Sequence, residues 1–557
     1  MIHCVRAPSR SSSKTHRPAT NLSRKCRNGW LVIAMFLLVL QGTVRAEGVF
    51  QVTATAEMLY VSGEATRQPL NIVERDAWES GSLPRRTAGL GSIQSPARFE
   101  LAVPRFDGRR DRLYSSFQAI GIASDGKPVP LGSPRYVDVW RGVSANRDPF
   151  PAAKSKKGLQ VQMLEDALAL GVRHAALNLN LGQLLDVHHR PENIRWDFGG
   201  ETFHFNAAFL RSMDHQVKTL SESGAVVSLI LLAYQSGDSE LNRVLLHPRY
   251  DNNCPNHLGA FNSVTEEGVK HFSAALEFLG HRYCATNYPQ GRVANFIIGN
   301  EVNSHWFWSN RGHCTMEEFA EDYLRAVRLA HTALRKTSSS ARVYLSLEHH
   351  WNIRYPGGKE GESFPAHPFI DYLHQRAVDE GDFDWHVAFH PYPENLFECR
   401  TWLDKSATTD PDTPRITFKN IELLTRYLAQ SPMQYSPAPD ASYSRQTRRV
   451  ILSEQGFHTA NEPDGELWQA AAYAYAYRKV ANNPGIDAFI LHRHVDHGQE
   501  GGLNLGLWTR RPGSIADPDR AKRIYEVFKQ ADHSDWQPAF EFALPVIGVK
   551  KWSDITP

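Results

Sequence analysis

The fold of this chain is decided by residues 294–303, which read Ala-Asn-Phe-Ile-Ile-Gly-Asn-Glu-Val-Asn. The apolar run Phe296-Ile297-Ile298 is too short for a helix and predicts a buried parallel strand. The run is followed closely by Glu301, and a carboxylate is costly to bury unless it has a partner or a function. Because the carboxyl ends of the strands carry the active site in a β/α barrel, the stretch predicts a functional carboxylate at a strand tip.

A second stretch has the same design. Residues 448–457 read Arg-Arg-Val-Ile-Leu-Ser-Glu-Gln-Gly-Phe, so another apolar strand ends in a carboxylate, Glu454. Two carboxylates on two strand tips of one barrel are the arrangement that glycosidases use.

Short apolar runs alternate with amphipathic helical patterns along most of the chain. We expect strands at residues 136–140, 172–179, 226–232, 296–298, 343–347, 385–389, 450–452 and 487–491. We expect the main helices at residues 207–223, 266–279, 316–335, 369–379, 417–430, 467–482 and 519–531. This alternation indicates a parallel sheet with right-handed crossovers, and eight units favour a closed barrel. No G-x-G-x-x-G motif follows the first expected strand, so a dinucleotide-binding fold has no support.

The fold class is therefore α/β, with a (β/α)8 TIM barrel at residues 133–535. A small β-rich module is expected before it at residues 47–132, where apolar and polar residues alternate between turn signals. A short C-terminal extension, residues 536–557, follows it and should contain a strand at 540–549. The segment 181–205 is expected to form a lid or hairpin.

Residues 1–46 differ in composition from the rest. They contain eight Lys or Arg, no Asp or Glu, an apolar run at residues 30–40 and then Val44-Arg45-Ala46. This pattern predicts a signal peptide cleaved near Ala46, and hence export to the periplasm or beyond, with no stable membrane insertion after cleavage. An uncleaved anchor is the alternative, although the run is shorter than the roughly 20 residues of a spanning helix. Removing the leader changes the formal charge from +2 to about −6, which gives no indication of a nucleic-acid partner.

Four of the six cysteines follow the leader, namely Cys254, Cys284, Cys314 and Cys399. In an exported chain they could form two disulfides in three possible pairings, which is the interpretation we favour over free buried thiols. Their spacing does not match a zinc site.

The motifs Gly299-Asn300-Glu301 and Ser453-Glu454-Gln455-Gly456 resemble those of the retaining glycoside hydrolases of clan A, which are built on (β/α)8 barrels. The resemblance covers residues 136–531 and is closest to poorly characterised bacterial barrels described only as glycosidase-like. It implies that Glu301 is the acid/base, that Glu454 is the nucleophile and that Asn300 binds the 2-hydroxyl of the sugar. It implies no metal and no organic cofactor.

Further candidates lie at the ends of the sixth and fifth expected strands. His390 and Tyr392 follow the sixth, where the clan often places a His or Tyr that orients the nucleophile. Glu348 and His350 follow the fifth and share one face of an extended chain. One of these two should face the cleft, and Glu348 is also the best rival for a catalytic carboxylate.

The eighth strand departs from the clan, which has a Trp there. His492 and His494 follow this strand and could suit a metal, although a polar rim or a cationic subsite for an acidic sugar is the favoured interpretation. Trp508 could replace the missing Trp. Trp306 and Trp308 follow the expected acid/base and either stack on sugar rings or pack beneath a loop.

Together these observations predict an exported retaining glycoside hydrolase that acts on a polysaccharide or oligosaccharide. Two alternatives remain, a non-catalytic sugar-binding barrel and a metal-dependent hydrolase that uses the histidines of the eighth strand. The sequence leaves the oligomeric state open.

Overall fold

The computed structural model describes residues 48–555 except 67, 82, 86–88 and 437–443. The predicted leader and its cleavage position lie outside the described residues, as do Cys4 and Cys26. Within the described part of the chain, no helix combines the length and apolar character needed to cross a membrane.

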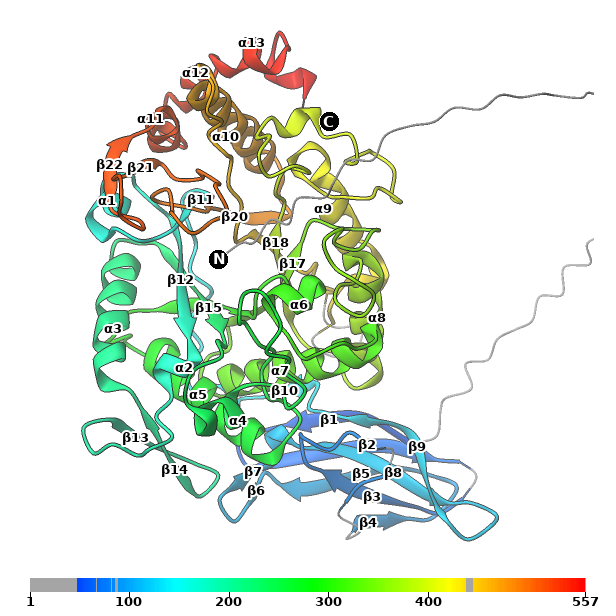
Figure 1. Cartoon of the computed structure of the whole chain (residues 1–557). Helices are drawn as coiled ribbons and strands as arrows, with labels where there is room; N and C mark the ends of the chain where they lie inside the picture. Colours follow the sequence, from blue (N-terminus) through cyan, green and yellow to red (C-terminus); the bar gives the residue numbers. More distant parts are fainter. Residues whose placement is uncertain (1–47, 67, 82, 86–88, 437–443, 556–557) are drawn as a thin grey trace, which may run out of the picture.

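The N-terminal module is a pair of four-stranded sheets, as the alternating sequence predicted (Figure 1). The first sheet has the order β10-β1-β2-β5, formed by Val139–Trp140, Gly48–Ala54, Met58–Ala65 and Ala97–Pro104. The second has the order β4-β3-β8-β9, formed by Gly89–Ile93, Leu70–Arg75, Ser116–Ile122 and Pro128–Arg135. Val52, Val61, Ile72 and Phe117 share one buried cluster. Because this cluster takes side chains from both sheets, the sheets pack face to face.

The predicted (β/α)8 barrel is confirmed. Eight parallel strands close on themselves, because the first strand pairs with the eighth. In order they are β11 (Lys157–Gln160), β12 (His174–Asn180), β15 (Val226–Leu232), β16 (Val293–Ile298), β17 (Arg342–Glu348), β18 (Trp385–His390), β19 (Val450–Leu452) and β20 (Ile486–Leu491).

The prediction for the first strand was wrong. Part of the expected segment, β10, pairs with β1 in the module through Thr53 and Val139. The first barrel strand is β11, which reads Lys-Gly-Leu-Gln and lacks the apolar run of the other strands. Position 158 favours glycine, because a Cβ there would lie 2.8 Å from the side chain of Ile490. This short polar segment pairs with β12 on one side and with β20 on the other.

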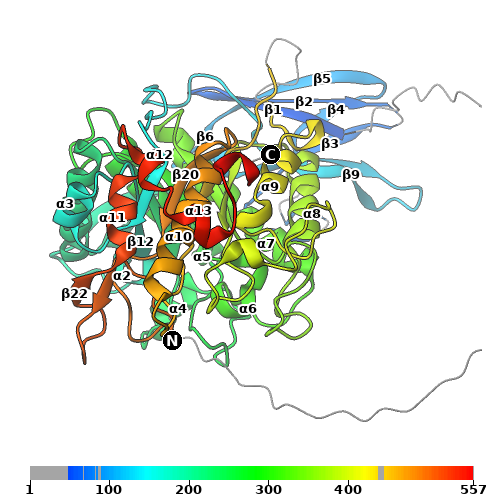
Figure 2. The ribbon, with the colours of Figure 1, turned by 90° about the horizontal axis from the view of Figure 1, so that it is seen from above.

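Helices surround the barrel and cover its outer face (Figures 1 and 2). The main ones are α1 (Leu164–Ala169), α3 (Ala207–Glu222), α5 (Glu266–Cys284), α7 (Met316–Thr337), α8 (Ala366–Asp379), α9 (Glu422–Leu428), α10 (Gly465–Ala481) and α11 (Arg523–Gln530). Capping residues mark the first turn of several of these helices. Asn206 caps α3, and Thr315 with Glu318 forms a capping box at α7.

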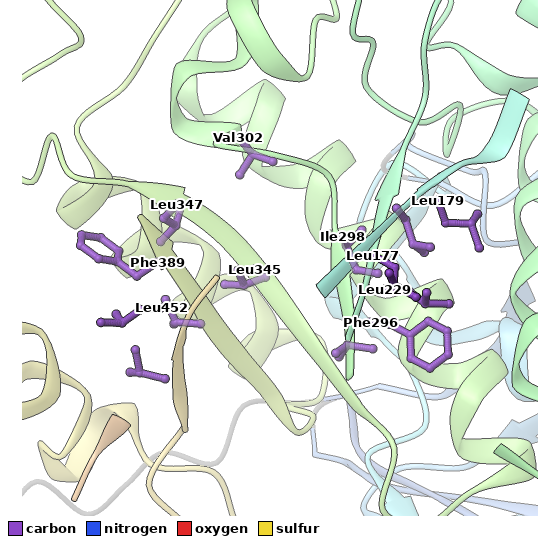
Figure 3. Close-up of a cluster of buried hydrophobic side chains, with 14 of the residues drawn as sticks. Leu177, Leu179, Leu229, Phe296, Ile298, Val302, Leu345, Leu347, Phe389 and Leu452 are labelled. Carbon is purple, nitrogen blue, oxygen red and sulfur yellow. The ribbon is translucent and has the colours of Figure 1, made fainter. Parts of the chain in front are cut away.

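Most of the barrel strands are predominantly apolar because both of their faces are buried. Ile230, Ile297, Tyr344 and Ile451 belong to a cluster of alternate strand residues that fills the barrel interior. The intervening residues pack in the layer between strands and helices (Figure 3), including Leu229, Phe296, Ile298, Leu345 and Leu452. A parallel strand covered on both faces therefore reads as a continuous apolar run.

The module packs on the barrel through α5 and α7. Tyr114 donates a hydrogen bond to Glu277 of α5 at 2.7 Å, and Lys336 of α7 pairs with Asp111 at 2.9 Å. These contacts join two parts of the chain that each have their own core.

Two further expectations concern the ends of the barrel. The segment after β12 contains a short helix, α2 (Leu181–Leu184), and the hairpin β13 (Ile194–Phe198) with β14 (Glu201–Phe205). The hairpin packs against α5, where the rings of Trp196 and Phe278 meet edge to face, so it is no lid. The strand expected at 540–549 is absent from this described segment, which contains the helix α13 (Ala543–Ile547) preceded by α12 (Trp536–Ala539).

The favoured prediction of disulfides was wrong, because all four described cysteines are free and buried. The Cys254 thiol contacts the Tyr250 hydroxyl at 3.2 Å, and Cys284 donates to the carbonyl of Val293. The alternative of free buried thiols therefore holds.

Candidate active site

One cavity lies at the carboxyl ends of the barrel strands. Its volume is about 310 Å³. It is lined by Asn178, Ile230, Leu232, Tyr234, Leu258, Asn300, Glu301, Ser304, Trp308, Glu348, His349, His350, Tyr355, Tyr392, Leu396, Glu454, His492, Arg493, His497, Gln499, Glu500, Leu503 and Leu505. The lining comes from the barrel and its loops, and includes no residue of the N-terminal module.

Glu301 is presented by an unusual turn at the end of β16. Gly299 has a φ of +79°, and Glu301 itself is left-handed with a φ of 41° and a ψ of 50°. For a residue other than glycine this conformation costs about 1–3 kcal/mol. The Glu301 amide donates to the Ser346 hydroxyl at 3.0 Å, which anchors the turn to the neighbouring strand β17.

The two predicted catalytic carboxylates face one cavity. Glu301, His390 and Glu454 each place one side-chain oxygen or nitrogen within 4.8 Å of the other two. Glu301 ends the fourth strand and Glu454 the seventh, so residues 153 positions apart in the chain meet only because the barrel closes.

Glu454 is held as a carboxylate. Tyr392 donates to its Oε1 at 3.1 Å, and the Gln160 amide donates to its Oε2 at 3.3 Å. Burial acts to raise the pKa of Glu454, but the charges of His492 and His390 and these two hydrogen bonds outweigh it. The pKa of Glu454 is therefore lowered, and the group is ionised near neutral pH.

Glu301 is shifted in the opposite direction. Burial of its side chain raises the pKa of Glu301, the hydrogen bond from His390 opposes that rise, and the negative charges of Glu454 and Glu348 add to it. His390 lies between the two sites, with Nδ1 at 2.9 Å from Glu301 Oε1 and Nε2 at 3.0 Å from the Ser453 hydroxyl. Two carboxyl groups whose environments separate their pKa values are suited to acid and nucleophile roles.

The two candidates at the end of the sixth strand, His390 and Tyr392, contact different glutamates. Tyr392 contacts Glu454, as expected for a residue that orients the nucleophile. His390 contacts Glu301 instead, so its position suits control of the proton on the acid/base.

Glu348 lies in a closed network of hydrogen bonds. Its Oε1 accepts from Asn303 at 2.7 Å and from Ser304 at 2.9 Å, and its Oε2 contacts His350 Nδ1 at 2.5 Å. Burial acts to raise the pKa of Glu348, yet its contacts with His350 hold that pKa well below the usual range. Glu348 and His350 line the cavity as a hydrogen-bonded pair, and the lowered pKa of Glu348 argues against it as a rival proton donor.

The histidines after β20 have separate partners. His492 lines the cavity, with Nδ1 at 2.7 Å from Gln160 and Nε2 at 3.0 Å from Glu500. His494 is buried and contacts Asp166 at 2.8 Å. Among the described residues, two groups have the spacing of metal ligands, Glu348-His349-His350 and Glu301-His390-Glu454, and neither includes His492 or His494.

The predicted aromatic residues do not all reach the cavity. Trp308 and the predicted hydroxyl ligand Asn300 line it. Trp306 is buried against the ring of His313 instead. Trp508 donates to Asp166 at 2.9 Å and packs on Tyr525, so it does not replace the missing Trp of the eighth strand.

Several lining residues were missed by the sequence analysis. Gln160 was missed because β11 was not recognised as a strand. Glu500 was missed although it is the only acidic residue in the glycine-rich segment 497–506, which was a readable signal. Tyr355 falls in the segment between the fifth strand and its helix, and Tyr234 lies two residues beyond β15. Only their position at strand ends could have indicated them.

Comparison with solved structures finds barrels of glycoside hydrolases. A family 39 glycoside hydrolase from Bacteroides cellulosilyticus WH2 is 11% identical with a TM-score of 0.41, covering 87% of this chain and 79% of that one. A β-glucosidase from Pyrococcus furiosus is 14% identical with a TM-score of 0.42, covering 69% and 86%. A β-glucuronidase from Bacteroides uniformis is 10% identical with a TM-score of 0.37, covering 88% and 50%. TM-scores below 0.5 do not bear on the chemistry of the site.

Comparison with curated proteins finds no match. The sequence profile of a family of unknown function, DUF5722, matches residues 149–555, which include the whole barrel and both glutamates. The match spans well over half of the chain, and the protein therefore belongs to the DUF5722 family.

Proposed function

We propose that this protein is an exported retaining glycoside hydrolase that cleaves a polysaccharide or oligosaccharide by double displacement. The observation that carries the proposal is the pair Glu301 and Glu454, whose oxygens lie within 4.8 Å across one cavity and whose pKa values are shifted in opposite directions. Retaining enzymes hold their carboxyl groups about 5–5.5 Å apart, whereas inverting enzymes need about 6.5–9.5 Å to admit a water. The short separation favours retention.

In the first step, ionised Glu454 attacks the anomeric carbon and forms an ester with the sugar. The bond from that carbon to the leaving oxygen breaks, and Glu301 gives its proton to this oxygen. Hydrogen bonds from Tyr392 and Gln160 keep the carboxylate of Glu454 aimed while it reacts.

In the second step, Glu301 has become the base. It takes a proton from water, the resulting hydroxide attacks the anomeric carbon, and the bond to Glu454 breaks. After the first step His390 is placed to stabilise the carboxylate form of Glu301 across 2.9 Å. The site then returns to its starting protonation.

Export and an external carbohydrate substrate belong to the same proposal. Export is supported by the basic and apolar pattern of residues 1–46 alone. Fusing residues 1–46 to a reporter enzyme that is active only outside the cytoplasm tests it, and a reporter retained in the cytoplasm would contradict it.

The experiment that tests the chemistry uses aryl glycosides and the variant Glu454→Ala. We expect kcat to fall by about 10⁴-fold or more, since a covalent mechanism loses its nucleophile. Azide should restore turnover and give a glycosyl azide of inverted configuration. Near-normal activity of Glu454→Ala would refute the assignment.

Two controls separate the alternatives. Glu301→Ala should spare substrates with good leaving groups, because these need little protonation. A sugar-binding barrel without chemistry would bind glycosides and release no product. A hydrolase that holds a metal between Glu301, His390 and Glu454, whose spacing permits it, would lose activity with a chelator and regain it with added metal.

A further inference from the structure

The glycine-rich loop after β20 places a carboxylate in the cavity. Oε1 of Glu500 contacts His492 Nε2 at 3.0 Å and forms an ion pair with Arg493 Nη1. Its other oxygen, Oε2, is buried and has no hydrogen-bond partner among the described residues, and the same holds for Arg493 Nε. The Glu500 side chain is 13% exposed, so most of the carboxylate is shielded from bulk water.

Glu500 lines the cavity, and the exposed part of its side chain is open to a ligand bound there. Burial acts to raise the pKa of Glu500, but His492 and Arg493 lower it to about 2, so the group is a carboxylate at working pH. A buried acceptor left without a donor is strongly unfavourable, and nearly all such groups in folded proteins have a partner. A sugar hydroxyl is a donor of suitable size for this cavity.

The same pairing removes the cation that an acidic sugar would need. Arg493 is the only Lys or Arg among the residues that line the cavity, and its charge is already matched by Glu500. Burial and the charge of Arg493 lower the pKa of His497, which favours its neutral form. A uronate carboxylate at this end of the cavity would meet a carboxylate and no unpaired Lys or Arg.

We propose that Glu500 accepts a hydrogen bond from a hydroxyl of the bound sugar and makes this cavity select neutral glycosides over uronides. The inference rests on the proposed function for the class of ligand, and it names Glu500 as a specificity-determining residue. It replaces the cationic subsite that the histidines after the eighth strand suggested.

The test is calorimetric binding to Glu454→Ala, which retains the cavity and does not consume the ligand. The probes are p-nitrophenyl glycosides of glucose, galactose, mannose and xylose in both anomers, against the matched glucuronides and galacturonides. We expect the best neutral glycoside to bind at least about 10-fold more tightly than its uronide, because an unpaired charge is costly to bury. Tighter binding of the uronide would overturn the inference.

Glu500→Gln on the Glu454→Ala background tests the residue itself. Affinity for the neutral glycoside should fall about 10- to 100-fold, as expected for a lost hydrogen bond to a charged group. The difference in affinity between the neutral glycoside and its uronide should become smaller, because Arg493 becomes free to pair with the uronate carboxylate. Glu360→Gln, which removes an equal charge from an exposed loop position, should change neither. Equal affinities in the Glu500 and Glu360 variants would overturn the inference.

Deoxy analogues of the best neutral glycoside give a sharper test. One analogue should lack the hydroxyl that donates a hydrogen bond to Glu500. It should bind Glu454→Ala more weakly than the parent glycoside does, and adding Glu500→Gln should not weaken its binding further. Additive losses for every analogue would overturn the inference. Failure of the proposed function is seen separately, as binding without turnover by the unaltered protein.

Discussion

Removing the hydroxyl of Tyr392 tests how the nucleophile is held. Tyr392 is 8% exposed and donates to Glu454 Oε1 at 3.1 Å, while Gln160 donates to the other oxygen at 3.3 Å. Phenylalanine has nearly the same volume, so Tyr392→Phe removes one hydrogen bond and little packing. A hydrogen bond to a charged group contributes about 1.5–3 kcal/mol, which equals about 1–2 pKa units on Glu454.

The structure favours the lower end of that range. His492, His390 and Gln160 each lower the pKa of Glu454 by more than Tyr392 does, so most of the stabilisation survives the change. Because Tyr392 stabilises the carboxylate form, its removal raises the pKa of Glu454, and the nucleophile becomes protonated at higher pH. We expect the acidic limb of kcat/KM to move up by about 1 pH unit.

The assay is the pH profile of kcat/KM with an aryl glycoside. The alkaline limb should stay in place, since it reports deprotonation of Glu301. Tyr372→Phe is the matched control, because it removes a tyrosine–glutamate hydrogen bond from the barrel surface, between Tyr372 and Glu321. An acidic limb that does not move in Tyr392→Phe, or moves equally in Tyr372→Phe, would refute the reasoning.

Three other predictions follow from the same structure. Glu301→Gln should abolish the alkaline limb of the pH profile on substrates with good leaving groups. That limb reports the loss of the Glu301 proton as pH rises, and glutamine has no such proton to lose. If the alkaline limb is unchanged in this variant, it belongs to another residue. Arg448→Met should lower the free energy of unfolding by about 3–5 kcal/mol in urea titrations, since it leaves Asp382 without its buried ion-pair partner; a change below about 1 kcal/mol would contradict this. Thiol titration of the denatured, unreduced chain lacking residues 1–46 should count four thiols, and a lower count would restore the disulfides.

The barrel could be predicted from sequence because its signals are local. A strand covered on both faces is mostly apolar, so a run such as Phe296-Ile297-Ile298 predicts a buried strand without information from the rest of the chain. An amphipathic helix shows its own period, and a carboxylate directly after an apolar run is costly to bury. Glu301 and Glu454 were found in this way, each from its own ten residues.

The one strand that lacks such a signal was misplaced. β11 is four residues long and polar at both ends, and it is a strand because β12 and β20 bond to it on either side. Gln160 was lost with it. Likewise, the sequence does not show how far apart the cysteines lie in the fold. Their even number in an exported chain suggested disulfides, whereas the four described thiols are free.

The sequence by itself determined the alternation of strands and helices, and with it the face of the barrel on which the glutamates lie. Only the tertiary structure decided what each glutamate touches: His390 lies beside Glu301, Tyr392 and Gln160 donate to Glu454, and a network of hydrogen bonds holds Glu348. The physical reason is that burial preferences and periodicity act along a few residues, whereas a pKa depends on charges and donors that arrive from distant strands once the barrel has closed.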